Sequence, residues 1–360
     1  MSEKLHVLFL TPGFPKDEED TACVTGIQAF LKALLKTRPH IRVTVIAMQY
    51  PREKKVYQWQ GVKVHALGRP DYRSVTKFFT TNRPLSLIRE IHVKNPIHIL
   101  HSFWLGECTM IGQKVEKKLG IKHLCTIMGR EMLGVNYYLK LIRLSKVRIV
   151  CQSAFQNSEL MKRFQVPQAK VIPFGIEVTD LTPLKDQARS NDLLFVGNIN
   201  ENKNLEGFLE IASRLIQQFP ELSILIIGDN FLETSVEGLL SKYGLKNNAR
   251  YLGKVSNQVV LENMLHSKIL VHTSFFEAGA LVFMEALLQG MYIVSREVGL
   301  VQKQERWQVA NTKEEFAEAI SGHLHSDLRF ERQIPYSIGQ TVEDYTGLYQ
   351  TLLSEASGAG

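Results

Sequence analysis

Two glutamates in the second half of the chain, Glu277 and Glu285, have the residue type and spacing that indicate chemistry. Both follow the apolar run Ile269–His272, and Gly279 lies between them. A loop that ends near Gly279 would leave backbone N–H groups unpaired at the start of a helix, a ready site for a diphosphate. Those groups belong to Ala280, Leu281 and Val282. Glu285 could then accept hydrogen bonds from sugar hydroxyls, while Glu277 stays in the loop. Alternatively, both carboxylates are only favourable charges beside a helix start.

Short apolar runs alternate with amphipathic stretches along the chain, a pattern typical of parallel sheets with crossover helices. The first series of predicted strands is Leu5–Leu10, Arg42–Met48, Ile97–His101, His123–Ile127 and Arg148–Cys151. The second is Asp192–Val196, Leu222–Ile227, Arg250–Leu252, Ile269–His272 and Tyr292–Val294. The pattern predicts two doubly wound α/β domains. Because open α/β sheets bind ligands at the carboxyl ends of their strands, we expect the site in strand-to-helix loops.

The segment from Ser274 to Gly290 resembles the donor-site motif of glycosyltransferase family 4, because seven residues separate its glutamates within Ser-x-x-Glu…Glu-Ala-x-x-x-Gly. The resemblance implies the GT-B fold, in which two Rossmann-like domains face a central cleft. It also implies transfer from a nucleoside-diphosphate sugar with retention of the anomeric configuration. In the family's terms Glu285 binds the ribose and Glu277 the transferred sugar. The remaining donor residues of this segment are Gly279, Ala280, Leu281 and Val282, the amides of the last two binding the diphosphate.

A second match lies in the run Phe195 to Asn204, which resembles the family's Gly-Arg…Lys-Gly loop. Gly197 holds the first glycine position, and Lys203 falls where the family has a phosphate-binding lysine. A lysine in this loop would stabilise the charge that develops on the leaving diphosphate. Lys203 and Glu277 are therefore the residues that we assign to catalysis.

The chain departs from the family pattern at several positions. Asn198 and Asn204 stand where arginine and glycine are usual, and asparagine donates a hydrogen bond without carrying a charge. In the loop Thr126 to Glu131, Met128 replaces the usual histidine and Glu131 the usual aspartate. Methionine cannot transfer a proton, so a mechanism that needs that histidine is excluded. These departures leave open a weak or specialised enzyme.

The resemblance extends more loosely over the rest of the chain. Lys254 and Val255 match the segment that lies beside the nucleotide base in the family, so both are assigned to the donor site. Gly26 matches a glycine-rich first loop, although a simple helix-start glycine is an equal alternative. A structural role is also open for the histidine at the end of the run Ile97–His101. The predicted acceptor or cleft residues are Gly13, Gly26, His101, Met128, Gly129, Arg130 and Glu131.

Domain boundaries follow from where the strand pattern fades. Residues 1–172 are predicted to form an N-terminal Rossmann-like acceptor domain, and residues 173–335 a C-terminal Rossmann-like nucleotide-sugar domain. Residues 336–360 are expected to form a helix that packs back toward the N-terminal domain, followed by a mobile tail from Ser354. The helical pattern covers Val342–Leu353, with Tyr345 and Tyr349 on one side.

Charge is divided unevenly along the chain. Residues 1–170 contain 28 Lys and Arg against 12 Asp and Glu, a balance of +16, whereas residues 171–360 contain 15 against 24, a balance of −9. The first half is therefore expected to meet an anionic partner, unless its charges are only a scattered solvated surface. A candidate helix carrying Lys140, Arg143, Lys146 and Arg148 predicts reversible contact with anionic membranes. Nucleic-acid binding is not expected, because no recognisable module or base-stacking motif is present.

Signals for metals, cofactors and export are weak. The acidic run Asp17 to Asp20 reads as a solvated loop, and no Asp-x-Asp motif occurs, so neither a metal nor a resident cofactor is expected. The four cysteines lack a Cys-x-x-Cys spacing, and no apolar run is long enough for a membrane span. The predicted location is the cytoplasm, with peripheral contact at the inner face of a membrane.

The sequence therefore predicts a glycosyltransferase whose partners are a nucleotide-sugar donor and an acceptor glycan or lipid-linked sugar. Two rival functions remain open. One is a catalytically weak nucleotide-sugar-binding protein, and the other is a sugar-nucleotide epimerase of the same fold, for which no general acid or base can be assigned.

Overall fold

The computed structural model of the chain describes residues 4–21, 23–69, 82–134, 136–178, 184 and 189–357. The chain divides into two compact units, unit 1 (Met1–Glu177 with Ile338–Gly360) and unit 2 (Val178–Ser337). Both divisions fall a few residues beyond the boundaries predicted after residues 172 and 335. The end of the chain thus belongs to the same unit as its beginning.

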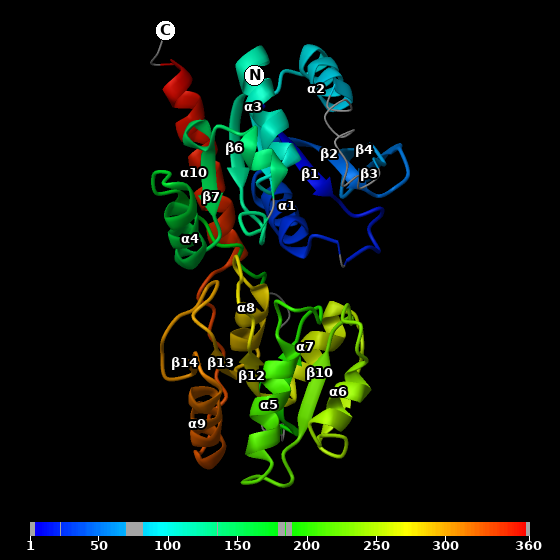
Figure 1. Ribbon diagram of the computed structural model, residues 1–360. Helices are drawn as coiled ribbons and strands as arrows, with labels where there is room; N and C mark the ends of the chain where they lie inside the picture. Colours follow the sequence, from blue (N-terminus) through cyan, green and yellow to red (C-terminus); the bar gives the residue numbers. More distant parts are fainter. Residues whose placement is uncertain are drawn as a thin grey trace. The chain divides into compact units, whose positions relative to one another are not determined.

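The sheet of unit 1 has the strand order β3-β4-β2-β1-β5-β6-β7-β8, parallel except for the β3–β4 hairpin (Figure 1). The strands are β1 His6–Gly13, β2 Arg42–Tyr50, β3 Lys55–Trp59, β4 Val62–Ala66, β5 Ile99–Phe103, β6 Lys122–Thr126, β7 Arg148–Cys151 and β8 Lys170–Val171. All five strands predicted for this half are present, with ends shifted by up to three residues, whereas β3, β4 and β8 were not predicted.

Helices cover both faces of this sheet. They are α1 Thr25–Thr37, α2 Asn82–Lys94, α3 Glu107–Leu119, α4 Ala154–Phe164 and α10 Ile338–Ser357, with the 3-10 turns η2 Tyr137–Lys140 and η3 Leu144–Lys146. Side chains alternate between the faces of a strand, and the packing follows this alternation. Leu8 and Leu100 lie in the cluster that includes residues of α2 and α3. Phe9 instead contacts Phe30 of α1 on the opposite face.

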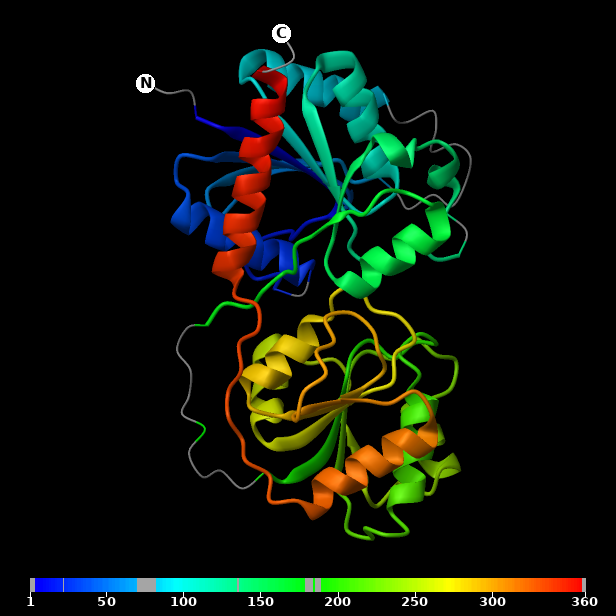
Figure 2. The same ribbon diagram turned by 90° about the vertical axis from the view of Figure 1, so that its left-hand side faces the viewer.

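Helix α10 completes the core of unit 1. Figure 2 shows it, in red, lying along one face of the sheet. Its Tyr345 and Tyr349 are fully buried, as expected for the apolar side of a helix. The helix spans Ile338–Ser357, so it is longer than the predicted Val342–Leu353 and includes most of the expected mobile tail. Residues 358–360 of that tail lie outside the described residues.

Unit 2 contains a parallel sheet with the order β11-β10-β9-β12-β13-β14. The strands are β9 Asn191–Val196, β10 Ile224–Ile227, β11 Ala249–Tyr251, β12 Ser267–His272, β13 Tyr292–Ser295 and β14 Trp307–Val309. The helices are α5 Leu205–Leu215, α6 Val236–Lys242, α7 Asn257–Leu265, α8 Leu281–Leu288 and α9 Lys313–His325. The core on one face joins the sheet to α5, α6 and α9.

The two units share one topology. Numbered along the chain, the six strands of unit 2 have the order 3-2-1-4-5-6, and so do β4-β2-β1-β5-β6-β7 of unit 1. This is the order of dinucleotide-binding folds, in which ligands bind where the strand order reverses. The reversal lies between β1 and β5 in unit 1 and between β9 and β12 in unit 2. The predicted class of two doubly wound α/β domains is confirmed. None of the helices in the described residues has the length and apolar character that crossing a bilayer requires.

Candidate functional site

The loops that follow β9 and β12 meet at the reversal point of unit 2, and they bring together two predicted residues and one that was not predicted. Nζ of Lys203 lies 2.6 Å from Oε1 of Glu277, with side chains only 18% and 14% exposed. Nε2 of His272, the last residue of β12, lies 3.1 Å from the same oxygen. Two donors from separate segments of the chain therefore converge on one carboxylate oxygen.

The charge state of this cluster follows from its surroundings. Burial alone would raise the pKa of Glu277, but the charge of Lys203 and the hydrogen bonds from His272 and Lys203 lower it to about 2. Burial lowers the pKa of His272, so its ring is neutral at neutral pH and donates Nε2–H to the carboxylate. Glu277 is therefore an anion at neutral pH, held in place by two donors.

Hydrogen bonds between the two loops hold the cluster in place. The amide of Asn202 donates to the carbonyl oxygen of Phe276 (2.9 Å), and the backbone N–H of Phe275 donates to the carbonyl of Asn202 (2.9 Å). The hydroxyl of Thr273 donates to the carbonyl of Lys203 (3.0 Å). Two buried atoms here, Oδ1 of Asn202 and Oγ of Ser274, have no hydrogen-bond partner among the described residues.

Small residues make room for this arrangement. A Cβ at Gly197, whose φ is +144°, would lie 3.1 Å from Cε of Lys203. A Cβ at Gly299 would lie 2.6 Å from the carbonyl oxygen of Gly279, to which the N–H of Leu300 donates.

Asn204 takes the left-handed conformation (φ 53°) that glycine favours, and its side chain accepts from the N–H of Gly207 at the start of α5. Asparagine tolerates this conformation, so the departure from glycine at this position is conservative.

Helix α8 begins at Leu281, one residue later than predicted. Ala280 precedes it in the left-handed conformation (φ 65°), so its own N–H is not among the first amides of the helix. No side chain of the described residues caps this start. The N–H of Phe283 donates to the carbonyl of Ala280, and the amides of Leu281 and Val282 remain the groups suited to an anion.

Glu285 lies one turn into α8. Burial of its carboxyl raises the pKa to about 7, against the opposing effect of a hydrogen bond with Asn257 at the start of α7. Asn257 was not predicted. The group is therefore poised between its neutral and charged forms at neutral pH, unlike Glu277.

The remaining donor candidates follow neighbouring strands at the same edge. Asn198 is exposed just after β9, and Lys254 is exposed with Val255 partly buried after β11. Gly253 takes a left-handed conformation (φ +67°), and its carbonyl accepts from the N–H of Gly228 after β10. The structure records no contact among described residues that joins Lys254 to the Lys203 cluster.

The candidates in unit 1 lie in different environments. The prediction that His101 faces a cleft is wrong, because its side chain is fully buried. Its Nδ1 lies 2.8 Å from the hydroxyl of Tyr349, and its Nε2 lies 2.7 Å from that of Thr126. Gly26 is buried in the first turn of α1, and Gly13 ends β1.

The loop after β6 is organised by Glu131. Its carboxylate accepts hydrogen bonds from the N–H groups of Met128 (2.6 Å), Gly129 (2.6 Å) and Leu105 (3.3 Å). Burial raises the pKa of Glu131, and these backbone hydrogen bonds oppose the shift. Arg130 is exposed on the same loop. Glu131 therefore stabilises the conformation of this loop through three backbone hydrogen bonds.

In the described part of the chain, no three His, Cys, Asp or Glu side chains are grouped as metal ligands would be. The acidic run near the N-terminus stabilises its own loop, because Oδ1 of Asp17 accepts hydrogen bonds from the backbone N–H groups of Glu19 and Asp20.

Comparisons with known proteins place these loops in context. Residues 182–337, nearly all of unit 2, match the model of a family described as Glycosyl transferases group 1. The chain is 24% identical over 286 residues to a phosphatidylinositol N-acetylglucosaminyltransferase subunit of Homo sapiens, an alignment covering 75% of this chain and 58% of the human protein. It spans 37% and 60% of two similarly named relatives, from Schizosaccharomyces pombe and Arabidopsis thaliana.

Solved structures match nearly the whole length of this chain. Sucrose-phosphate synthase from Thermosynechococcus elongatus has a TM-score of 0.69 at 16% identity, with 99% of this chain and 98% of the other covered. HepE of Anabaena, solved in complex with UDP, has a TM-score of 0.63 at 12% identity, with 99% of each chain covered. The predicted fold is confirmed as that of the GT-B glycosyltransferases, and unit 2 carries the sequence match to a glycosyltransferase family.

Proposed function

We propose that this chain transfers a sugar from a nucleoside-diphosphate sugar to an acceptor, with retention of the anomeric configuration. The observation that carries the proposal is the Lys203–Glu277–His272 cluster at the reversal point of unit 2, beside the uncapped start of α8. This cluster lies within the residues that match the glycosyltransferase family.

The donor diphosphate would bind between Lys203 and the amides of Leu281 and Val282. Without donor, Lys203 pairs with Glu277 at 2.6 Å. A diphosphate offers Lys203 a second anion, so Nζ is shared between phosphate and carboxylate when donor binds. His272 keeps its hydrogen bond to Glu277 and holds that carboxylate in place. Lys203 then stabilises the negative charge that develops on the leaving group.

Glu277 would face the transferred sugar, and Glu285 the ribose. As the bond between sugar and phosphate breaks, positive charge develops on the sugar ring. An anion that stays ionised across the working pH range stabilises this charge, and the low pKa of Glu277 supplies one. The ribose does not change during transfer, so a carboxyl near it contributes to binding alone.

Names of similar proteins suggest the first donor to test. The human relative is called a phosphatidylinositol N-acetylglucosaminyltransferase subunit, and HepE was solved with UDP. We therefore propose UDP-N-acetylglucosamine as the first donor, with phosphatidylinositol, lipid-linked sugars and glycans as the first acceptors.

The test combines donor binding with transfer. Thermal shifts of the full chain with UDP-, GDP-, ADP- and TDP-sugars identify the donor, because only a ligand that prefers the folded state raises the melting temperature. Lys203→Ala is expected to lower both donor affinity and kcat. The matched control is Lys268→Ala, which breaks a 2.7 Å pair with Asp192 at the opposite end of the same two strands. Equal loss in both variants, or none in either, would contradict the proposed site.

A second candidate function rests on Asn198 and Met128, which replace groups that the family uses for charge and proton transfer. It is nucleotide-sugar binding with little catalysis. A donor that raises the melting temperature while no acceptor receives sugar would favour this candidate over transfer.

A further inference from the structure

A cavity of unit 1 lies at the amino-terminal edge of its sheet, opposite the edge from which the strand-to-helix loops leave. Its lining includes the first residues of β1 and β2, residues of β4 and the last turns of α2. The volume is about 340 Å³, within the roughly 300–1,000 Å³ of pockets that bind small ligands. Strand β2 runs from Arg42 at the cavity to Tyr50 at the carboxyl edge, and a strand of this length spans roughly 25 Å. The cavity is therefore separate from the loops assigned above in this unit.

Polar side chains of three neighbouring strands form one wall of this cavity. The register of the sheet pairs His6 with Arg42 and Thr44 with Lys63, and His65 lies two residues beyond Lys63 on β4. Residues that pair across a sheet, or that lie two apart along a strand, point to the same face. Further along the strands the same face carries the apolar core beneath α2 and α3. The cavity is thus the polar border of that core.

Some polar groups of the cavity already have partners. Nε2 of His6 lies 2.9 Å from the hydroxyl of Thr44, and its Nδ1 lies 3.1 Å from the carbonyl oxygen of Pro96. On α2, Nζ of Lys94 lies 2.8 Å from Oε1 of Glu90. These contacts fix two sides of the cavity and use the hydrogen-bonding groups of His6.

Other donors at the cavity remain available to a ligand. Arg42 donates one N–H to Oδ1 of Asn95 at 2.6 Å, and the rest of its guanidinium makes no hydrogen bond within the described residues. Lys63 is exposed and His65 is half-buried, and neither forms a hydrogen bond or an ion pair with any described residue. Two cationic groups and an imidazole therefore line the same space without a full set of partners.

The cavity carries an excess of positive charge. Arg42, Lys63 and Lys94 line it, and Glu90 is the one carboxylate among its described lining residues. Burial lowers the pKa of both histidines in the lining, so their rings are neutral at neutral pH. Three cations and one carboxylate leave a net charge of +2. A phosphate monoester, which carries about −1.5 to −2 charges at pH 7, matches this excess.

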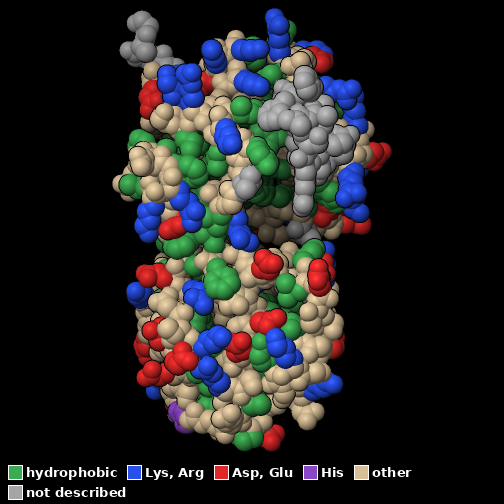
Figure 3. Space-filling model, viewed as in Figure 1, with side chains coloured by type: hydrophobic (Ala, Val, Ile, Leu, Met, Phe, Trp, Pro, Cys, Tyr) green, Lys and Arg blue, Asp and Glu red, His purple; other side chains and the backbone are tan. Residues whose placement is uncertain are grey.

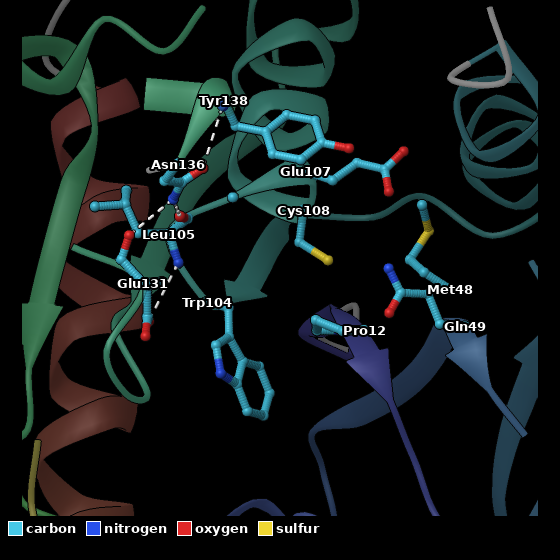
Figure 4. Close-up of a pocket in the computed structure, with 11 residues that line it drawn as sticks. Pro12, Met48, Gln49, Trp104, Leu105, Glu107, Cys108, Glu131, Asn136 and Tyr138 are labelled. Carbon is cyan, nitrogen blue, oxygen red and sulfur yellow. Dashed lines mark hydrogen bonds between the residues drawn. The ribbon is translucent and has the colours of Figure 1, made fainter. Parts of the chain in front are cut away.

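A pocket at the carboxyl edge of the same sheet has the opposite charge. Figure 4 shows Glu107 and Glu131 among the residues that line it, and no Lys or Arg is among the described ones. The nearby Arg69 already pairs with Glu107 at 2.7 Å. A dianion is therefore disfavoured at the carboxyl edge and favoured at the amino-terminal edge.

We propose that the cavity at the amino-terminal edge binds a phosphate monoester. The phosphate oxygens accept hydrogen bonds from Nζ of Lys63, from the guanidinium of Arg42 and from the ring of His65. The bound phosphate joins the β3–β4 hairpin to β2 and so stabilises unit 1. The same chemistry serves a small soluble ester and the phosphate headgroup of a lipid. This site is independent of the diphosphate site in unit 2 and of the proposed transfer.

Calorimetry of the full chain tests the site. The chain is titrated with glycerol 3-phosphate, inorganic phosphate and glycerol. We expect saturable binding of the two phosphates and none of glycerol. The same binding is expected in Lys203→Ala, which removes the lysine assigned to the donor diphosphate. Loss of phosphate binding in Lys203→Ala would overturn the inference, because it would assign the phosphate to the donor loops.

Three variants at exposed positions test the charges of the cavity. Lys63→Gln is expected to weaken phosphate binding roughly tenfold, the effect of losing one charged hydrogen bond. Glu90→Gln removes the opposing carboxylate and is expected to tighten binding roughly threefold, as for one exposed charge. The control is Lys36→Gln on α1, at the opposite face of the sheet, which removes an equal charge and should leave phosphate binding unchanged. Unchanged binding in both Lys63→Gln and Glu90→Gln would overturn the inference.

Vesicles distinguish the two sources of the phosphate. Co-sedimentation is compared between vesicles that contain phosphatidic acid, a phosphate monoester, and vesicles of equal surface charge that contain phosphatidylglycerol, a diester. A preference for phosphatidic acid that Lys63→Gln removes assigns the site to a lipid headgroup. Binding of the soluble phosphates without this preference assigns it to a small ester. Binding of neither kind would overturn the inference, even in a chain that transfers sugar. A phosphate site that depends on Lys63 in a chain that binds no nucleotide sugar would support the inference and contradict the proposed function.

Discussion

At the scale of single residues, one carboxylate oxygen of unit 2 accepts hydrogen bonds from two different segments of the chain. Oε1 of Glu277 accepts from both Nζ of Lys203 and Nε2 of His272. A carboxylate held by two donors is ordered before substrate arrives, which reduces the reorganisation needed during reaction. The ring of His272 is itself fixed by an edge contact with Phe283 of α8, with centroids 4.7 Å apart.

The two glutamates should have separable kinetic effects. Glu277→Gln removes charge near the reacting bond, so kcat is expected to fall roughly ten- to a hundredfold, as for one charged hydrogen bond of about 1.5–3 kcal/mol. Glu285→Gln removes a contact present in both ground and transition states, so KM for donor should rise with little change in kcat. Steady-state kinetics of both variants, after circular dichroism confirms folding, gives the comparison. A loss of kcat alone in Glu285→Gln and a rise of KM alone in Glu277→Gln would show that the two roles are reversed. If neither constant changes in either variant, the two glutamates are only favourable charges beside a helix start.

The raised pKa of Glu285 predicts a pH-dependent stability. Between its ordinary pKa of 4.5 and its folded value of about 7, the unfolded chain releases a proton that the folded chain retains. Stability therefore falls as pH rises through this window, by up to about 3 kcal/mol at 1.36 kcal/mol per pKa unit. Urea unfolding of the wild-type chain and of Glu285→Gln across the window measures the difference. Parallel curves for the two proteins would show that Glu285 is not buried in this way.

Transfer is expected to proceed without a divalent cation, because Lys203 and the amides at the start of α8 meet the phosphate charge. Activity should persist after EDTA treatment and dialysis. Loss of activity that Mg²⁺ or Mn²⁺ restores would contradict this assignment of the phosphate contacts.

Only some of the residues in this site could be predicted from the sequence. Lys203 and Glu277 stand in recognisable motifs, and the structure places them in contact. His272 follows the apolar run Ile269–Val271, so the sequence favours a core or surface position for its side chain over a place in the site. Its position as the last residue before the loop was the available signal. Asn257 precedes Glu285 with most of α7, the strand β12 and a loop between them, so no local sequence pattern links the two residues.

At the scale of elements, α10 is attached to the sheet of unit 1 through buried hydroxyls. Tyr349 contacts Nδ1 of His101, and Tyr345 lies 2.8 Å from the hydroxyl of Thr126, which in turn contacts Nε2 of the same histidine. Burial lowers the pKa of His101 well below its usual range, so the ring stays neutral and the chain of hydrogen bonds needs no counter-ion. The helix thus contributes polar as well as apolar contacts to this core.

Removing one hydroxyl should destabilise the whole of unit 1. Tyr349→Phe leaves Nδ1 of buried His101 without that partner, a cost of about 1–3 kcal/mol. Tyr137→Phe is the matched control, because Tyr137 is 64% exposed. Thermal unfolding of the two variants is expected to separate them by several degrees. A Tyr349→Phe protein as stable as the control would show that the hydrogen bond is replaced by water or is not formed.

The sequence predicted best the strands that are buried on both faces of a sheet, because such strands are continuous apolar runs. The β3–β4 hairpin at the sheet edge was missed. Val56 in β3 is 59% exposed, and Gln60 and Gly61 form the turn with φ values of 47° and 76°. Short edge strands with mixed polarity carry little of the apolar signal. Helix α10 was underestimated because residues outside the predicted Val342–Leu353, such as Gln340 and Ser354, are polar and exposed, so they carry no apolar signal.

At the scale of the whole molecule, some of the basic residues in the first half of the chain lie beside exposed apolar side chains on one surface of unit 1. Tyr137 and Leu141 are 64% and 49% exposed beside Lys140, Arg143 and Lys146, a set that we call the η2–η3 surface. Arg148 of the predicted cluster is instead paired with Glu116 and Glu355. Figure 3 shows Lys and Arg side chains spread over the visible face of unit 1.

We propose that the η2–η3 surface contacts anionic membranes, which would place the chain at the inner face of a cellular membrane. Each basic residue near such a surface contributes about 1 kcal/mol, which salt screens. Co-sedimentation with anionic vesicles at low salt should exceed that with neutral vesicles, and Lys140→Glu with Lys146→Glu should abolish the excess. The control pair is Lys246→Glu with Arg250→Glu, exposed positions of unit 2. Equal binding to both vesicle types would leave a scattered solvated surface as the explanation of the charge.

Because the chain returns to unit 1 only after unit 2 is complete, the order of synthesis has a physical consequence. Unit 2 is one continuous stretch, Val178–Ser337, whereas unit 1 needs Ile338–Ser357 to cover its core. Domains generally fold as they emerge during synthesis, the N-terminal ones first. Here the first unit to begin is the last to finish: until α10 leaves the ribosome, Phe30 and His101 lack the tyrosines that cover them. A nascent chain stalled before residue 338 would therefore present a finished unit 2 and an open apolar face on unit 1, a state in which chaperones would find a binding surface.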